Sequence, residues 1–125
     1  MLVKNSDFNR KGFEYDLLDF VELQRIDGPT RLYETPEGKR YPSVTAVLGK
    51  MTDKSALEAW KKRVGEDEAA RVSSRAATRG TNIHTMCENY VLGHDIDTSM
   101  PHNMMMFNQI KKVLDEKVDM VRATE

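Results

Sequence analysis

The fold is decided by the stretch Arg79-Gly80-Thr81-Asn82-Ile83-His84-Thr85-Met86-Cys87-Glu88, in which a helix pattern and two candidate functional side chains begin together. Gly80 predicts a break in the preceding helix. Thr81 predicts an N-cap, because its side-chain oxygen can accept hydrogen bonds from the first-turn amides. Gly93 is the expected end of this helix. Its apolar positions recur with the period of a helix that buries one face: Ile83, Met86, Cys87, Tyr90 and Val91.

His84 and Glu88 are four residues apart, so a helix would place them on one face. A neutral imidazole and a carboxylate in this arrangement can share a metal ion or hydrogen-bond to each other. The same spacing is common in helix-surface pairs and in hydrogen-bonded core histidines, and spacing alone favours that structural role. Cys87 is the single cysteine, which excludes an internal disulfide and predicts a small core residue in a reducing compartment.

The length of 125 residues suits one domain or a part of one. Lys and Arg (19) almost balance Asp and Glu (20), so no global electrostatic field indicates a nucleic-acid or membrane partner. Hydrophobic residues make up 39% and aromatic residues 7%, which is lean for a self-sufficient core and indicates an incomplete domain. Because no apolar run could span a membrane and no signal-peptide pattern is present, we expect a soluble, cytoplasmic protein without a membrane partner.

The patterns along the chain predict an α+β fold that is mostly α, with an N-terminal antiparallel β-ribbon followed by a bundle of about five helices. Residues 1–19 lack periodicity and are expected to be a loop or a flexible N-terminus. Residues 20–41 contain short apolar runs separated by two turns, which predicts a three-stranded meander. Residues 42–117 form the helical region, and residues 118–125 the start of a core strand. We interpret residues 1–125 as a single, truncated domain.

Local signals predict where the first helices begin and end. Ser43 is the expected N-cap of a short helix that Gly49 closes. Ser55 and Glu58 match a capping box at the start of the next helix, which Gly65 ends. The acidic residues 66–68 suit the first turn of a third helix, which is expected to run to about residue 79.

After the central helix, residues 94–99 predict a polar loop. Pro101 is placed as at a first helical position. The methionines at 104–106 indicate adaptable core or an uncovered contact surface in preference to a cofactor site. A long amphipathic helix is expected here, with an apolar stripe at Met106, Phe107, Ile110, Val113 and Leu114.

Basic side chains gather between residues 54 and 79. Arg71, Arg75 and Arg79 are spaced by four, so they form one stripe on a helix face, as contacts with successive phosphates require. Charge alone favours an ordinary solvated helix face. The stripe ends at the turn that presents His84 and Glu88, and this adjacency favours a functional role for the arginines.

Three motifs carry a family resemblance. Residues 41–48 read YPSVTAVL, residues 60–66 read WKKRVGE, and residues 79–84 read RGTNIH, followed by Glu88. In this order they resemble the front part of RecB-like exonucleases of the PD-(D/E)XK superfamily, above all phage exonucleases and the mitochondrial genome-maintenance exonuclease. The resemblance covers roughly residues 20 to 125, and the R-G-T-x-x-H piece is its most specific part.

The resemblance implies the N-terminal portion of a Mg²⁺-dependent DNA exonuclease, in a phage protein acting inside a bacterial cell. It places catalytic and metal-binding functions at His84 and Glu88. The family's main ligands, an Asp and a Glu-x-Lys, would lie beyond Glu125, so the metal-binding sheet is absent from this partial fold. Mg²⁺ or Mn²⁺ belongs to the complete enzyme, and this chain alone is expected to bind neither tightly and to be inactive. The implied DNA-binding residues are Lys61, Lys62, Arg63, Arg71, Arg75, Arg79 and Thr81.

Two further expectations concern partners. The alternative to a nuclease is a non-catalytic DNA-binding or protein-assembly module, in which the basic helix is the functional part. A homo-oligomer through exposed apolar helix faces is also expected, since Ile83, Met86, Tyr90 and Val91 require a cover that residues 1–125 do not encode.

Overall fold

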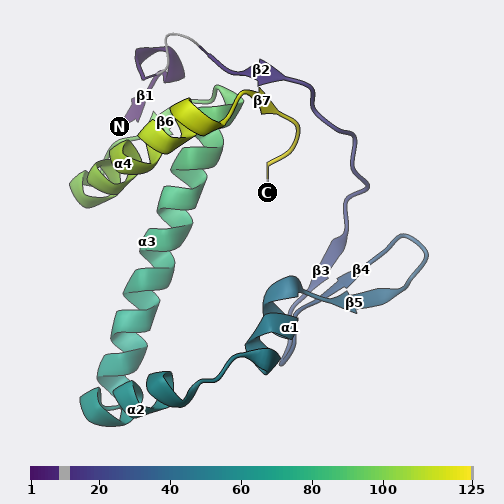
Figure 1. The fold of residues 1–125 in the computed structure, drawn as a ribbon, viewed down its shortest axis with the longest axis vertical. Helices are drawn as coiled ribbons and strands as arrows, with labels where there is room; N and C mark the ends of the chain where they lie inside the picture. The colour runs from purple at the N-terminus through teal and green to yellow at the C-terminus, as the bar shows by residue number, and fades with distance from the viewer. Residues whose placement is uncertain (9–11, 125) are drawn as a thin grey trace. The chain divides into compact units, whose positions relative to one another are not determined.

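The computed structural model describes residues 1–8 and 12–124. These residues divide into two units, residues 1–18 with 70–124 and residues 19–69, each of which is described by itself. Figure 1 labels the elements along the chain. The α+β, mostly α fold class is confirmed. The helices of the described ranges are α1 (Val44–Met51), α2 (Ser55–Val64), α3 (Glu66–Leu92) and α4 (Pro101–Lys117).

Helix α3 is continuous for 27 residues where the sequence predicts two helices. The predicted break at Gly80 and the predicted N-cap at Thr81 are therefore wrong, and four helices replace the expected five in the part of the chain described. A glycine inside a helix costs only about 0.5–1 kcal/mol relative to alanine, which tertiary packing of the same helix can offset. The predicted end at Gly93 is confirmed by its positive φ of 79° and by its amide, which donates to the carbonyl of Tyr90.

The predicted start of α1 is confirmed, and its predicted end is wrong. The Ser43 hydroxyl accepts a hydrogen bond from the Ala46 amide at 3.1 Å, as an N-cap does. Gly49 lies inside the helix, which continues to Met51.

The capping box predicted for α2 is also wrong. Ser55 is the first helical residue, and Lys54 precedes it without a side-chain cap. The Asp53 carboxylate instead accepts a hydrogen bond from the Ser55 amide at 2.9 Å. Gly65 ends α2 with a φ of 90°, as the sequence predicts.

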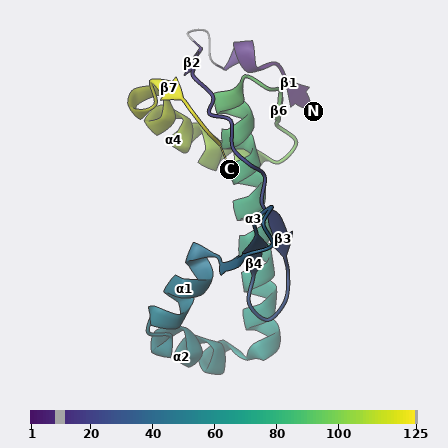
Figure 2. The same ribbon diagram turned by 90° about the vertical axis from the view of Figure 1, so that its right-hand side faces the viewer.

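The unit of residues 19–69 contains the predicted meander. Strands β3 (Gln24–Ile26), β4 (Leu32–Glu34) and β5 (Arg40–Pro42) pair antiparallel in the order of the chain. Figure 2 shows α1 near this small sheet. Many large apolar side chains of this unit are exposed, among them Phe20, Val21, Leu23, Val44, Leu48, Met51 and Leu57.

The other unit contains the buried core, which α3 and α4 build where they lie side by side in Figures 1 and 2. Met86, Tyr90 and Phe107 are 5%, 0% and 0% exposed. The rings of Tyr90 and Phe107 meet edge to face with centroids 5.6 Å apart, and Phe13 meets Tyr90 in the same way at 5.4 Å. Cys87 packs partly buried against this cluster, and burial raises the pKa of its thiol.

The apolar stripe of α3 is therefore covered by this chain itself. Ile83 is only 7% exposed, and the described residues supply the cover that the sequence argument takes to be missing. The expectation of a bare α3 face is wrong, because the N-terminal residues and residues 94–99 contribute to the core. Phe8 meets Phe107 edge to face with centroids 6.0 Å apart.

Short strands occur within residues 1–8, 12–18 and 94–99, where the sequence predicts loops. Strand β1 (Leu2–Val3) pairs antiparallel with β6 (Ile96–Asp97), whose Ile96 is fully buried. A 3₁₀ turn (Asn5–Asp7) follows β1. Strand β2 (Glu14–Tyr15) pairs parallel with β7 (Met120–Val121), which confirms a strand within residues 118–125. These strands are too short to carry a periodic signal, so pairing with a distant segment reveals them.

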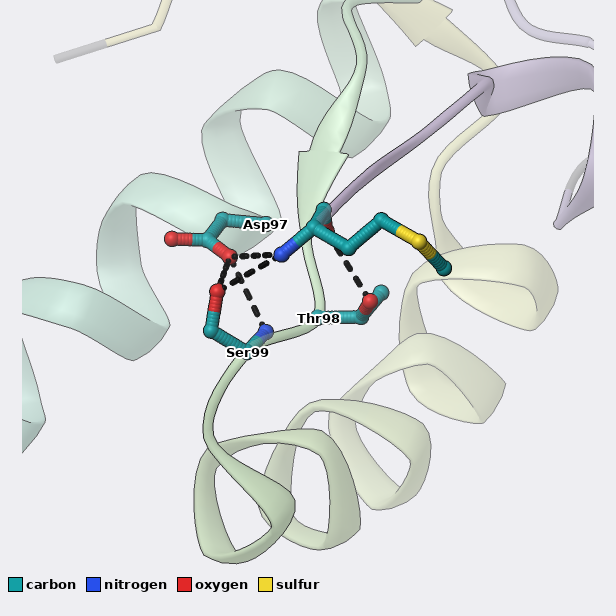
Figure 3. Close-up of polar contacts among 4 residues, drawn as sticks. Asp97, Thr98 and Ser99 are labelled. Atoms are coloured by element: carbon teal, nitrogen blue, oxygen red, sulfur yellow. Dashed lines mark hydrogen bonds and ion pairs between the residues drawn. The ribbon is translucent and has the colours of Figure 1, made fainter.

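The N-terminal residues also satisfy the last carbonyls of α3, which have no partner within the helix. The Asn5 side-chain amide donates to the carbonyl oxygens of Asn89, Tyr90 and His94 at 3.3, 2.9 and 3.2 Å. The Tyr15 hydroxyl donates to the Val91 carbonyl at 2.6 Å. The N-terminal ammonium group of Met1 donates to the Ser99 hydroxyl at 2.8 Å and lies 3.4 Å from the Asp97 carboxylate. Figure 3 shows the side chains of Asp97 and Ser99 joined by a dashed line.

Helix α4 begins at Pro101, as predicted, but its buried side differs from the predicted stripe. Phe107 and Leu114 face the core, whereas Met106, Ile110 and Val113 are 41%, 37% and 55% exposed. The buried side instead includes Asn103 and Met104.

Polar contacts tie α4 to the centre of the core. The Asp115 carboxylate accepts a hydrogen bond from the Tyr90 hydroxyl and forms an ion pair of 2.8 Å with Lys111. Burial, together with the hydrogen bond to Asp115, raises the pKa of Tyr90.

We predict that Phe107→Ala lowers the free energy of unfolding by about 3–5 kcal/mol, because it removes a fully buried ring and two aromatic contacts. Met105→Ala, on the same helix at a position that is 64% exposed, is the matched control and should have little effect. Urea unfolding followed by circular dichroism measures both. Equal midpoints for the two variants would contradict this core; loss of a cooperative transition in Phe107→Ala alone would support it.

Candidate nucleic-acid interface

The continuous helix α3 sets the direction of each candidate side chain. Arg79 precedes Ile83 by four residues and Met86 by seven, so it lies on the same face as the buried stripe. Arg75 precedes Arg79 by one further turn. Arg75 and Arg79 therefore prolong the core-facing side of α3, whereas an ordinary solvated pair would lie opposite the core.

A cleft of about 360 Å³ lies where this face meets the beginning of α4. Neither Arg75 nor Arg79 has an ion pair or hydrogen bond among residues 1–8 and 12–124. Arg71, one turn earlier, is exposed and does not line the cleft. The cleft is lined by Ser74, Arg75, Thr78, Arg79 and Asn82 of α3 and by Met100, His102 and Asn103.

The beginning of α4 brings unsatisfied backbone donors to the same cleft. Met100 is the N-cap and has no side-chain cap, and Pro101 has no amide hydrogen. The first amide with an acceptor is that of Met104, which donates to the Met100 carbonyl at 3.0 Å. The amides of His102 and Asn103 find no acceptor in the described part of the chain. Such amides, at the positive end of the helix dipole, favour an anion.

His84 and Thr81 share a different surface. Together with Gly80 and Thr85 they line an open hollow of about 310 Å³. His84 is exposed, and Glu88 is partly buried. The Glu88 carboxylate accepts a hydrogen bond from the Thr124 hydroxyl at 3.0 Å, which links α3 to the segment after β7.

The arginine stripe and the His84–Glu88 pair do not face the same way. Five residues separate Arg79 from His84, and this spacing rotates the side chains about 140° apart around the helix axis. The cleft and the hollow accordingly share no lining residue. The adjacency inferred from the sequence is thus adjacency along the chain, and it does not bring the two groups together on one surface.

The basic residues of α2 belong to the unit of residues 19–69, and the cleft belongs to the other unit. Lys61 is partly buried and lies 3.8 Å from the Glu58 carboxylate, one turn earlier on the helix. Lys62 and Arg63 are exposed.

The residues present do not fit a complete magnesium site. Mg²⁺ prefers octahedral coordination by carboxylate and water oxygens. Within the ranges that the structure describes, no three His, Cys, Asp or Glu side chains gather in a way that could hold a metal ion. His84 and Glu88 supply one imidazole and one carboxylate, and the carboxylate already accepts a hydrogen bond. His84 and Glu88 could therefore supply only a part of the ligand set of a magnesium ion.

Of the described residues that line the cleft, only Arg75 and Arg79 are predicted as site residues from the sequence, and the most consequential omissions are His102 and Asn103. The signal that could have found them is Pro101 at the first helical position without a Ser, Thr, Asp or Asn before it, which leaves the next amides uncapped. Their position opposite Arg75 and Arg79 depends on the crossing of α3 and α4, which no local pattern encodes.

Comparisons with family models, curated proteins and solved structures found no match to this chain. None of the helices in the described residues is both long and apolar enough to cross a membrane.

Proposed function

We propose that this chain is the N-terminal portion of a Mg²⁺-dependent DNA exonuclease of the RecB-like type, with DNA contacts from α3 and with His84 near the site of phosphodiester hydrolysis. The observation that carries the proposal is the pair Arg75 and Arg79. Their guanidinium groups have no partner in the described chain, yet they lie in line with the buried face of α3 and line a cleft. Guanidinium groups recognise phosphate oxygens with paired hydrogen bonds, so this arrangement suits a DNA backbone.

Gly80 adds support from the other face. It lies inside a helix, its φ is not positive, and a Cβ added there would meet nothing within 4 Å. Neither backbone conformation nor packing therefore requires glycine, although glycine weakens the helix. A residue without a side chain in the hollow that it lines with Thr81 and His84 would let a ligand such as DNA approach the helix backbone closely.

A non-catalytic DNA-binding module is the second candidate, and one observation favours it. The arginine face lies about 140° around α3 from His84, so phosphate contacts there need no hydrolysis on the other face. The two candidates can be distinguished by the source reading frame. The exonuclease requires that it continue past Glu125 into Asp and Glu-x-Lys motifs, and the DNA-binding module does not.

We predict that the chain binds DNA weakly and that the affinity falls steeply with salt. Each phosphate contact contributes about 0.7–0.9 to the slope of log affinity against log salt, so Arg71, Arg75 and Arg79 together account for roughly 2 to 3. Changing all three arginines to glutamine should remove that contribution. Fluorescence anisotropy with a labelled oligonucleotide at several salt concentrations measures the slope.

The matched control for the arginine variant replaces three exposed lysines, Lys39, Lys112 and Lys117, by glutamine. It changes the net charge equally but leaves α3 intact. We expect its salt slope to stay close to that of the original chain. Equal losses of slope in the two variants would assign the arginines to a general charge effect and count against a specific interface.

We predict that the 125-residue chain alone does not degrade DNA, because His84 and Glu88 do not complete a metal site. End-labelled DNA incubated with the pure chain and Mg²⁺ or Mn²⁺ is the assay. A metal-dependent product that co-purifies with the chain through two columns and disappears in His84→Ala would overturn this prediction. A version of the protein that includes the Asp and Glu-x-Lys motifs should degrade DNA in the same assay and lose activity on His84→Ala.

Self-association also remains a proposal, now with a different apolar surface. The unit of residues 19–69 exposes several large apolar side chains, including Val44 and Met51 of α1 at 74% and 78% exposure. Burial of such side chains between two copies would stabilise a dimer. We expect light scattering at micromolar concentration to report more than 14.3 kDa. A cooperatively folded monomer that binds no dye for exposed apolar surface would contradict the proposal.

A further inference from the structure

We propose that the cleft between α3 and α4 is a binding site for a single phosphate group, held by Arg75, Arg79, Asn103 and the first amides of α4. The inference deepens the proposed function: the site itself follows from the geometry, and the assignment of the phosphate to DNA rests on the proposed function.

The first argument is the convergence of donors from two helices. Arg75 and Arg79 come from α3, one turn apart, and the uncapped amides of His102 and Asn103 come from the beginning of α4. Ser74 and Thr78, which carry hydroxyl groups, line the same cleft. A tetrahedral oxyanion can accept several hydrogen bonds at once, and charge-assisted bonds to guanidinium groups are the strongest of these.

The second argument is Asn103. The residue as a whole is only 8% exposed, and its side chain forms no hydrogen bond among the residues that the structure describes. A buried amide without a partner is costly, so native structures pair such groups with protein, water or ligand. No described side-chain nitrogen or oxygen is both shut off from solvent and without a partner. The amide of Asn103 therefore keeps access to solvent, and Asn103 lines the cleft.

The charges of the lining residues indicate which of two adjacent clefts would bind an anion. A second cleft, of about 170 Å³, also reaches Asn82, Met100 and Asn103 but includes Asp97. Hydrogen bonds from Ser99 lower the pKa of Asp97, so this carboxylate contributes a negative charge to the second cleft, where it already pairs with the Met1 ammonium group. No carboxylate is among the described residues that line the cleft of Arg75 and Arg79. An anion is therefore favoured in the cleft of the arginines.

The test is a titration of the ¹⁵N-labelled chain with inorganic phosphate, with chloride at matched ionic strength as the reference. We expect saturable shifts of the His102 and Asn103 backbone amides and of the Asn103 side-chain amide. Phosphate shifts that match those of chloride, or that spread over the exposed lysines without saturation, would overturn the proposal.

Two variants connect the shifts to the cleft. Arg75→Gln combined with Arg79→Gln should weaken phosphate binding about tenfold or more, since it removes both charge-assisted donors. Both side chains are exposed, so the fold should persist. Lys112→Gln combined with Lys117→Gln also removes two positive charges, but from α4 and outside the cleft. This variant should leave the affinity for phosphate unchanged. Equal affinities in the two double variants would overturn the proposal.

A second titration, with a short single-stranded oligonucleotide, identifies the source of the phosphate. If the oligonucleotide shifts the same amides, and inorganic phosphate reverses these shifts by competition, the result would support the site and a DNA phosphate as its occupant. Shifts with inorganic phosphate alone would support the site with free phosphate as its ligand and count against the proposed DNA function. Binding of the oligonucleotide elsewhere, without shifts of these amides in either titration, would overturn the site and leave the DNA function standing.

Discussion

In α3, helical hydrogen bonding continues without a break from Glu66 to Leu92, and this continuity fixes which side chains can act together. Each residue turns the side-chain direction by about 100°, so the buried positions of the C-terminal half determine the directions of the positions before them. Arg75 and Arg79 fall on the core-facing side, and His84 falls well away from it. A break at Gly80 would have decoupled these directions. The directions of these candidate side chains are therefore a consequence of one uninterrupted helix.

The C-terminal end of the same helix depends on residues that are remote in the sequence. Its last carbonyls accept hydrogen bonds from Asn5 and Tyr15, and its buried Tyr90 contacts Phe13 and Phe107. The N-terminal segment thus adds side-chain hydrogen bonds to the carbonyl groups at this end of the helix. This coupling explains how a chain with few aromatic residues closes a core around α3, because several of those residues meet at one point.

The sequence predicted the features that depend on local chemistry. The Ser43 cap and the Gly65 and Gly93 ends follow from side-chain hydrogen bonding and from positive φ. The errors arise where tertiary packing outweighs a local signal. Gly80 does not break α3, and Ile96 lies buried in a short strand within a stretch that reads as a polar loop. Two-residue strands leave no periodic trace, so their partners cannot be found without the fold.

In the candidate site, too, the local features could be predicted from the sequence and the tertiary ones could not. Arginine spacing predicts one stripe, and the helix bears this out, but the spacing could not show that the stripe prolongs the buried face. Nor could it show that Asn103 of α4 lies in the same cleft, since that depends on how two helices meet. The separation of Arg79 from His84 around α3 then has a consequence for any nucleic acid bound to this chain. A strand that reaches both surfaces must pass around the helix, and Gly80, which has no side chain, lies between them in the sequence. Phosphate contacts and hydrolysis would then involve different segments of the strand, so the loss of one need not abolish the other.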